Sequence, residues 1–146
     1  MQLKEVMTRD VEVIHPEATL QEAAEKMDAL NVGPLPVCDG TRLVGMLTDR
    51  DMVVRAISAG RDPKTTKVRD VMTRDVVYAF EDQDVTDAAK LMEDKQIRRL
   101  VVLDRDKRLV GIVSLGDLAV DTGDERKTGE VLERVSEPAR PDRSKA

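Results

Sequence analysis

The strongest constraint on this chain is that it repeats itself. The hexapeptide Val6–Val11 (VMTRDV) recurs letter for letter at Val71–Val76, at an offset of 65 residues. The tetrapeptide Arg42–Gly45 (RLVG) recurs at Arg108–Gly111, at an offset of 66, because the second copy has one more residue in the preceding loop. Two copies of about 60 residues therefore account for the chain up to residue 121.

Both copies predict the same order of elements: strand, helix, strand, strand, helix. In the first copy we expect a strand at 11–14, a helix at 19–30, strands at 35–38 and 43–47 and a helix at 48–59. In the second copy the corresponding ranges are 76–79, 84–95, 99–103, 108–113 and 114–121. This order predicts an α/β (α+β) fold built from two βαββα halves.

The first helix of each copy has clear signals. Thr19 and Glu22 have the spacing of a capping box, which would open the helix. The apolar residues that follow fall on one stripe at helical spacing: Leu20, Ala23, Ala24, Met27 and Leu30. We therefore expect this stripe to face the core.

The repeat also sets the domain boundaries. We place the first repeat at 1–60, a polar linker containing Pro63 at 61–67, and the second repeat at 68–121. The remaining residues, 122–146, form a charged C-terminal tail, with a candidate helix at 130–135 and a frayed end. The short linker predicts that the two halves pack together.

Composition narrows the function. The net charge of −5 has the wrong sign for a protein that follows a nucleic-acid backbone. No apolar run is long enough to span a membrane, and the N-terminus lacks the core of a signal peptide, so we expect a cytoplasmic protein. The single Cys38 and single His15 predict no metal site, and no nucleophile is paired with a base, so we expect no enzyme.

The motif Gly-x-x-[Ser/Thr]-x-x-Asp ends both copies, with Thr48 and Asp51 in the first and Ser114 and Asp117 in the second. One interpretation is a capping box that opens the last helix. The other is a ligand site, since a strand that turns directly into a helix presents free N–H groups, a hydroxyl and a carboxylate to a crevice. Gly45 would then let a ligand approach closely. The spacing alone leaves both interpretations open.

The repeated unit resembles the cystathionine-beta-synthase (CBS) domain, and the chain resembles a tandem CBS pair, also called a Bateman module. The shared pattern is V-M-T, a T-x-x-E-A-x-x-x-M helix, L-P-V, and L-V-G-x-x-[ST]-x-x-D. In the first copy it falls at Val6–Thr8, Thr19–Met27, Leu35–Val37 and Leu43–Asp51. In the second copy it falls at Val71–Thr73, Asp84–Met92, Leu100–Val102 and Leu109–Asp117, with Val101 in place of the proline.

The resemblance implies two halves packed about a pseudo-twofold axis, with clefts that bind an adenosine ligand such as AMP, ADP, ATP or S-adenosylmethionine. By match, Asp51 and Asp117 would bind ribose, and Thr48 and Ser114 would lie near ribose or phosphate. The residues expected beside adenine are Val11, Val13, Pro34, Leu35, Val76, Tyr78, Arg99 and Leu100. The ligand would be regulatory, most often AMP, ADP or ATP, with no catalytic cofactor.

The two copies differ where specificity is expected. Gly33-Pro34 in the first becomes Arg98-Arg99 in the second, and Arg50 becomes Gly116. Arg98, Arg99 and Arg50, together with Arg55, could contact a ligand phosphate, or they could be ordinary solvated arginines. We therefore expect unequal sites.

The leading hypothesis is a sensor in which adenosine-ligand binding changes how the module pairs with itself or with a separately encoded target protein. By resemblance we expect a homodimer. The alternative is a protein-interaction or dimerisation module whose clefts are degenerate and bind no nucleotide. Nucleotide titration and sedimentation would separate the two.

Overall fold

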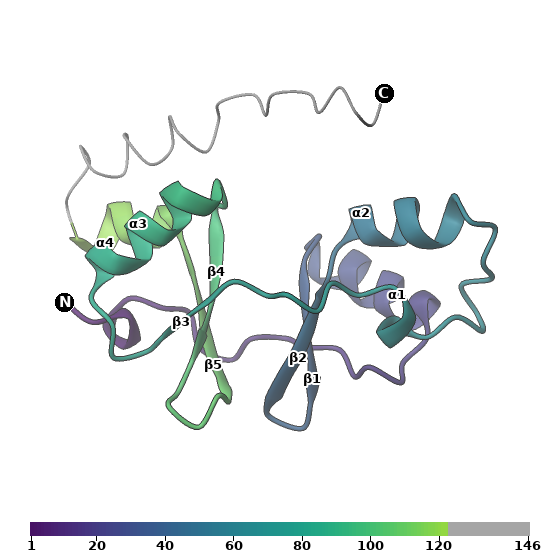
Figure 1. The fold of residues 1–146 in the computed structure, drawn as a ribbon, viewed down its shortest axis with the longest axis horizontal. Helices are drawn as coiled ribbons and strands as arrows, with labels where there is room; N and C mark the ends of the chain where they lie inside the picture. The colour runs from purple at the N-terminus through teal and green to yellow at the C-terminus, as the bar shows by residue number, and fades with distance from the viewer. Residues whose placement is uncertain (123–146) are drawn as a thin grey trace.

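The computed structural model describes residues 1–122, and the predicted tail helix and frayed end lie outside that range. Two halves of mixed helix and sheet stand side by side (Figure 1). In sequence order the first repeat contains η1 (Leu3–Glu5), α1 (Leu20–Leu30), β1 (Leu35–Asp39), β2 (Arg42–Leu47), α2 (Asp49–Asp51) and η2 (Met52–Ile57). The second repeat contains η3 (Val68–Asp70), β3 (Tyr78–Phe80), α3 (Val85–Lys95), β4 (Arg99–Leu103), β5 (Leu109–Ser114) and α4 (Leu115–Thr122). The predicted α+β fold class is confirmed.

The sheets of the two halves differ in their first strand. In the second half, β3 pairs with β4 in parallel and β4 with β5 antiparallel. In the first half, β1 and β2 form an antiparallel pair, and the strand predicted at 11–14 is wrong: only Ile14 forms a parallel bridge, to Val37. The Ile14 N–H donates to the Pro36 carbonyl and its carbonyl accepts from Cys38. Extending this ladder toward Glu12 would need an N–H at Pro36, which proline lacks.

The second half has Val101 where the first has Pro36, and Glu81, whose N–H donates to the Leu103 carbonyl at 2.8 Å, where the first has Pro16; both differences favour β3. Val101 has a backbone N–H, so the parallel ladder continues through Tyr78 opposite Val101. The departure of the second copy from the L-P-V pattern therefore lengthens the sheet.

The first helices match the prediction in extent but only partly in burial. The Glu22 N–H donates to Thr19 Oγ1 at 3.2 Å and opens α1 as expected. Leu20, Ala23 and Met27 are buried, whereas Ala24 and Leu30 are exposed, contrary to the predicted stripe. In the second half α4 packs against α3 and buries both Ala88 and Ala89. The corresponding helices of the first half pack less closely, which leaves Ala24 uncovered.

The last helix of the first half is α-helical only in its first turn. From Met52 to Ile57 it is a π-helix, with the Ser58 N–H donating to the Val53 carbonyl five residues earlier at 2.9 Å. Gly60, at φ +72°, follows its end. This helix leaves an apolar face exposed, formed by Val53, Val54 and Ile57.

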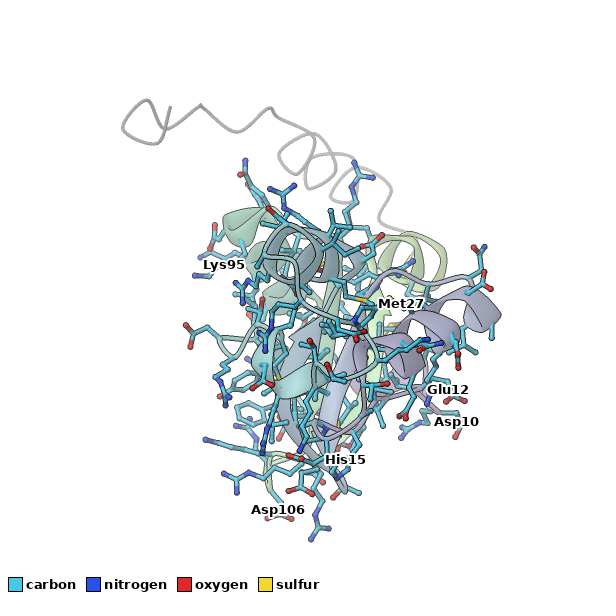
Figure 2. All side chains as sticks on the ribbon, turned by 90° about the vertical axis from the view of Figure 1, so that its right-hand side faces the viewer. Asp10, Glu12, His15, Met27, Lys95 and Asp106 are labelled. Carbon is cyan, nitrogen blue, oxygen red and sulfur yellow. The ribbon has the colours of Figure 1, made fainter. Side chains whose placement is uncertain are left out.

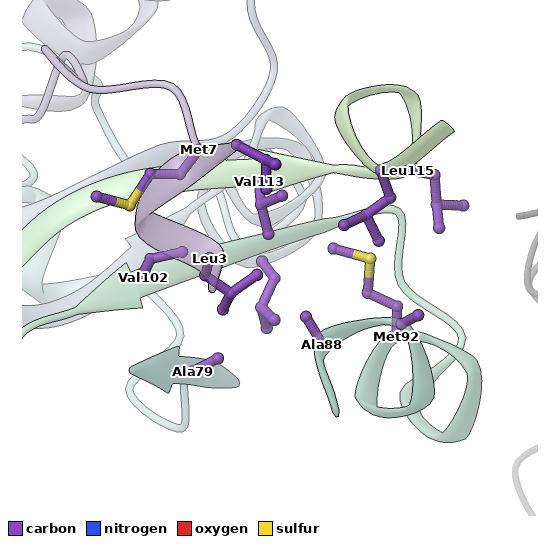
Figure 3. Packing of buried hydrophobic residues seen from close by; sticks show 12 residues of the cluster. Leu3, Met7, Ala79, Ala88, Met92, Val102, Val113 and Leu115 are labelled. Atoms are coloured by element: carbon purple, nitrogen blue, oxygen red, sulfur yellow. The ribbon is translucent and has the colours of Figure 1, made fainter. Parts of the chain in front are cut away.

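The start of each repeat packs into the other half. Leu3, Val6 and Met7 belong to the core of the second half, where Figure 3 shows Leu3 and Met7 beside Val113 of β5 and Val102 of β4. By symmetry Val68, Val71 and Met72 belong to the core of the first half. The two halves are therefore joined by an exchange of their V-M-T segments.

Backbone pairing fixes this exchange. Thr8 and Ile112 form an antiparallel bridge with hydrogen bonds of 2.8 and 3.0 Å, and Met46 and Thr73 form the matching one with two of 2.8 Å. A further bridge joins Arg42 to Arg108, its own counterpart in the other copy. Because a residue that pairs with its counterpart lies on a twofold axis, this bridge marks the pseudo-twofold axis of the pair.

The exchange also explains the glycines of the repeated motif. A Cβ on Gly45 would lie 2.7 Å from Met72 Sδ and 2.9 Å from the Thr73 carbonyl oxygen. A Cβ on Gly111 would lie 2.6 Å from Met7 Sδ and 2.9 Å from the Thr8 carbonyl oxygen. These glycines therefore make room for the crossing segment of the other half, whereas the sequence had suggested close approach of a ligand.

Candidate functional site

A cavity of about 630 Å³ lies between the two halves. Its walls come from equivalent positions of the two copies, for example Leu35 with Leu100 and Thr48 with Ser114. Both repeats therefore contribute to one pseudo-symmetric cleft. Its volume is in the range of small-molecule sites in proteins.

Many of the predicted site residues line this cleft. They are Val11, Pro34, Leu35, Thr48, Val76, Arg99, Leu100, Ser114 and Asp117. They come from the segment that follows V-M-T in each copy, from the start of β1 and β4, and from the junctions of β2 and β5 with the helices that follow them. The predicted hydroxyls, carboxylate and apolar residues thus meet in one place.

Five predicted residues are not part of the lining: Val13, Arg50, Asp51, Tyr78 and Arg98. The Val13 carbonyl accepts from Lys26 Nζ at 2.6 Å. Tyr78 is exposed and makes an edge-to-face contact with Phe80, with ring centroids 5.5 Å apart. Arg50 and Arg98 are both exposed.

The capping boxes predicted from the repeated motif are present in both halves. The Thr48 N–H donates to Asp51 Oδ2 at 3.0 Å, and the Asp51 N–H donates to Thr48 Oγ1 at 3.1 Å. Ser114 and Asp117 make the same two bonds at 2.9 and 3.2 Å. Each aspartate therefore opens a helix, whatever else it binds.

The two aspartates differ in their remaining contacts. Asp51 has only 14% of its side chain exposed, with Arg55 Nε 3.8 Å and Thr73 Oγ1 3.4 Å from its Oδ1. Arg55 also donates to the carbonyls of Val71 and Met72, at 3.3 and 3.2 Å. Arg55, which the sequence offered as a phosphate ligand, is thus engaged with the crossing segment of the second repeat.

Asp117 stands in a different setting, because the sequence has Asp121 at the position equivalent to Arg55. Asp117 lines the cleft, and its Oδ1 has no hydrogen bond with residues 1–118. An ionised carboxylate can accept two hydrogen bonds from vicinal hydroxyls. The second-repeat half of the cleft therefore has a carboxylate available to a ligand.

Sequence reasoning missed five polar residues of the cleft: Thr8, Asp10 and Glu12 in the first copy, and Thr73 and Asp75 in the second. All except Glu12 belong to the VMTRDV hexapeptide. The two copies of the hexapeptide are identical in sequence, including their polar residues. Packing requires only the apolar residues, such as Met7, so the repeated polar residues could have indicated a site.

The remaining reactive side chains are accounted for locally. Cys38 is buried, and burial raises the pKa of its thiol to about 11, which suits a packing role. His15 Nδ1 accepts from the Glu17 N–H at 3.1 Å. Within residues 1–122 no three His, Cys, Asp or Glu side chains are grouped as metal ligands, and no helix is long and apolar enough to cross a membrane.

The fold and the two-sided cleft define a module of two tandem repeats. The chain belongs to the CBS domain family, whose model matches residues 3–57 and 68–120. It is 42% identical over 134 residues to the CBS domain-containing protein YhcV of Bacillus subtilis, covering 92% of this chain and 94% of YhcV.

Two similar solved structures contain ligands. One is the CBS domain pair of protein MJ0100 in complex with 5′-methylthioadenosine and S-adenosyl-L-methionine, with 28% identity, a TM-score of 0.70, and coverage of 86% of this chain and 98% of that one. The other is CBSX2 in complex with AMP, with 26% identity, a TM-score of 0.72, and coverage of 86% and 98%.

Proposed function

We propose that this protein is a regulatory module that binds an adenosine-containing ligand in the cleft between its two CBS repeats. The observation that carries the proposal is the cleft itself, which gathers hydroxyls, a carboxylate and apolar walls from both copies. The adenosine ligands of MJ0100 and CBSX2 support the same class of ligand: AMP, ADP, ATP or S-adenosylmethionine.

Within the cleft, Asp117 is proposed to bind the ribose, with Ser114 beside it. Leu100 and Val76 are proposed to contact the adenine, because both are apolar residues of the lining from the second repeat. Asp51 is proposed to contribute less, because Arg55 and Thr73 already occupy its carboxylate. The proposal therefore predicts one stronger site and one weaker site.

Calorimetric titration of the full chain with AMP, ADP, ATP and S-adenosylmethionine tests this proposal. Saturable binding of at least one ligand, weakened by Asp117→Ala, is the expected result. Failure of all four to bind would contradict it. Circular dichroism of the variant confirms that its fold is retained.

Occupancy is proposed to act through association of this protein with itself or with a separately encoded target. The exposed apolar face of Val53, Val54 and Ile57 supports a homodimer, because contiguous exposed apolar side chains mark protein contacts. Sedimentation with and without ligand measures the effect. Ile57→Glu should shift the protein toward monomer.

The alternative is an interaction module that binds no nucleotide. The capping boxes favour this alternative, because they give both aspartates a structural role that needs no ligand. Dimerisation of the protein, together with no measurable binding of any nucleotide in the titrations, would establish this alternative. Under either function we propose no catalysis, and the cytoplasmic location stays a prediction from the sequence.

A further inference from the structure

The VMTRDV hexapeptide places an unpaired carboxylate on the cleft in each half. Asp10 and Asp75 line the cleft, and their side chains make no hydrogen bond or ion pair with other residues of the described chain. The adjacent arginines do not neutralise them. Arg9 donates to the Lys4 carbonyl at 3.2 Å, and Arg74 donates to the equivalent Arg69 carbonyl at 3.4 Å.

The other charged residues of the lining do not neutralise these carboxylates. Glu12 lines the cleft beside Asp10, and its carboxylate is 3.2 Å from Lys26 Nζ. Asp117 adds a further carboxylate, and Arg99 is the one cationic side chain in the lining as described. Even with Glu12 offset by Lys26, three carboxylates face one guanidinium.

We propose that this cleft selects adenosine compounds whose 5′ substituent is neutral or cationic, such as a thioether or a sulfonium, over adenosine 5′-phosphates. This inference rests on the proposed function and narrows its ligand class. Asp10 and Asp75 are its specificity-determining residues.

The physical basis is repulsion between the cleft carboxylates and a phosphate. AMP brings about two negative charges, since the second pKa of a phosphate monoester is near 6. The Debye length is about 8 Å at physiological salt, so a phosphate bound beside one of these carboxylates would be screened only in part. A positive sulfonium is attracted by the same carboxylates. A difference of roughly tenfold in affinity follows from these terms.

The test is calorimetric titration of the full chain with four probes in the absence of divalent cations: 5′-methylthioadenosine, S-adenosylmethionine, AMP and ADP. The thioether and the sulfonium should bind about tenfold or more tightly than AMP, and ADP should bind no better than AMP. Raising the salt concentration should narrow the gap.

Charge-removing variants assign the effect to named residues. Asp10→Asn and Asp75→Asn should each strengthen AMP binding about threefold and weaken S-adenosylmethionine binding. Asparagine suits the positive φ of 54° at Asp10, so the change is conservative. The matched control is Asp106→Asn, which removes the same charge far from Asp10 and Glu12 (Figure 2) and should leave the ratio unchanged.

The outcomes separate the two proposals. AMP or ADP binding as tightly as the thioether would overturn this inference and leave the proposed function intact. An equal change in the ratio from Asp106→Asn would also overturn it, because the effect would then reflect net charge rather than the cleft. Failure of all four probes to bind would overturn the proposed function and this inference with it.

Discussion

The two halves of the cleft are built on one motif and differ in what surrounds it. In both halves a hydroxyl and an aspartate close the same capping box. In the first half Arg55 and Thr73 occupy the free side of the Asp51 carboxylate. In the second half the corresponding side of Asp117 faces the cleft.

This difference separates an aspartate whose carboxylate is occupied by other side chains from one whose carboxylate lines the cleft, which the sequence motif alone cannot do. Helix capping uses the backbone N–H groups and one carboxylate oxygen, so it is retained in both copies. Ligand binding requires the second oxygen to stay available. In Asp51 this oxygen is occupied by Arg55, one helical turn away, and by Thr73 of the crossing segment.

The largest effect we expect comes from the feature that the two halves share. Gly111→Ala and Gly45→Ala each place a Cβ within 3 Å of a methionine sulfur and a carbonyl oxygen of the crossing segment. Each should lower the free energy of unfolding by about 3 kcal/mol. Urea denaturation measures this cost.

The control for the glycine variants is Gly40→Ala. A Cβ added to Gly40 would have no atom within 4 Å apart from its chain neighbours, so only the positive φ of 64° opposes the change. It should cost about 1 kcal/mol. A cost at Gly111 no larger than at Gly40 would mean that the crossing segment is loosely held.

The aspartates give the next largest effect and separate the halves. Asp117→Ala should weaken adenosine-ligand binding by about 10- to 100-fold, through loss of charge-assisted hydrogen bonds. Asp51→Ala should lower stability by about 1 kcal/mol, through loss of its cap, and change affinity less. Calorimetry and urea denaturation of both variants make the comparison. Equal losses of affinity would show that the halves bind alike.

Removing Arg55 sharpens the comparison further. Arg55→Met takes away two hydrogen bonds to main-chain carbonyls and a partly exposed ion pair, so it should cost about 1 kcal/mol of stability. It also frees the Asp51 carboxylate, which should strengthen the weaker site. The matched control is Arg50→Met, an exposed neighbour outside the cleft. Unchanged stability in Arg55→Met would contradict its role in holding the crossing segment.

The smallest effect concerns the first helices of the two halves, which have different caps. Thr19 opens α1, whereas Asp84 opens α3, and a hydrogen bond from the Thr86 hydroxyl lowers the pKa of the Asp84 carboxyl to about 2. Because the folded pKa lies below the usual value of about 4, this cap stabilises the fold above pH 4 and is lost as the pH falls toward 2.

An Asp84→Ser variant tests this difference, because serine caps a helix without titrating between pH 4 and 2. Its stability should depend less on pH in this range than that of the wild type. Identical slopes in thermal melts across the range would show that the cap contributes nothing measurable.

Much of the fold could be predicted because each local sequence pattern, such as a helix cap or a strand, occurs in both copies. The cap at Thr19 and the strands around the β1–β2 turn follow from short-range patterns that recur in the second copy. The capping interpretation of Ser114 and Asp117 was also available from their spacing.

The errors come from contacts between segments far apart in the sequence. The strand at 11–14 fails because its partner Pro36 has no N–H, and Ala24 is exposed because η2 does not cover it as α4 covers Ala89. The positions of Asp10 and Asp75 on the cleft depend on the exchange of segments, which no local pattern indicates.

The exchanged segments also have a consequence for how the chain acquires its structure during synthesis. The residues around Thr8 leave the ribosome before their partner strand around Ile112, which is made about a hundred residues later. The core of the first repeat stays uncovered until Val68 and Val71 are made, and Met7 has no core to pack into until the second repeat is made. Contacts at such long range slow folding. Although the gene is a duplication, we expect the smallest part of it that folds to be the pair.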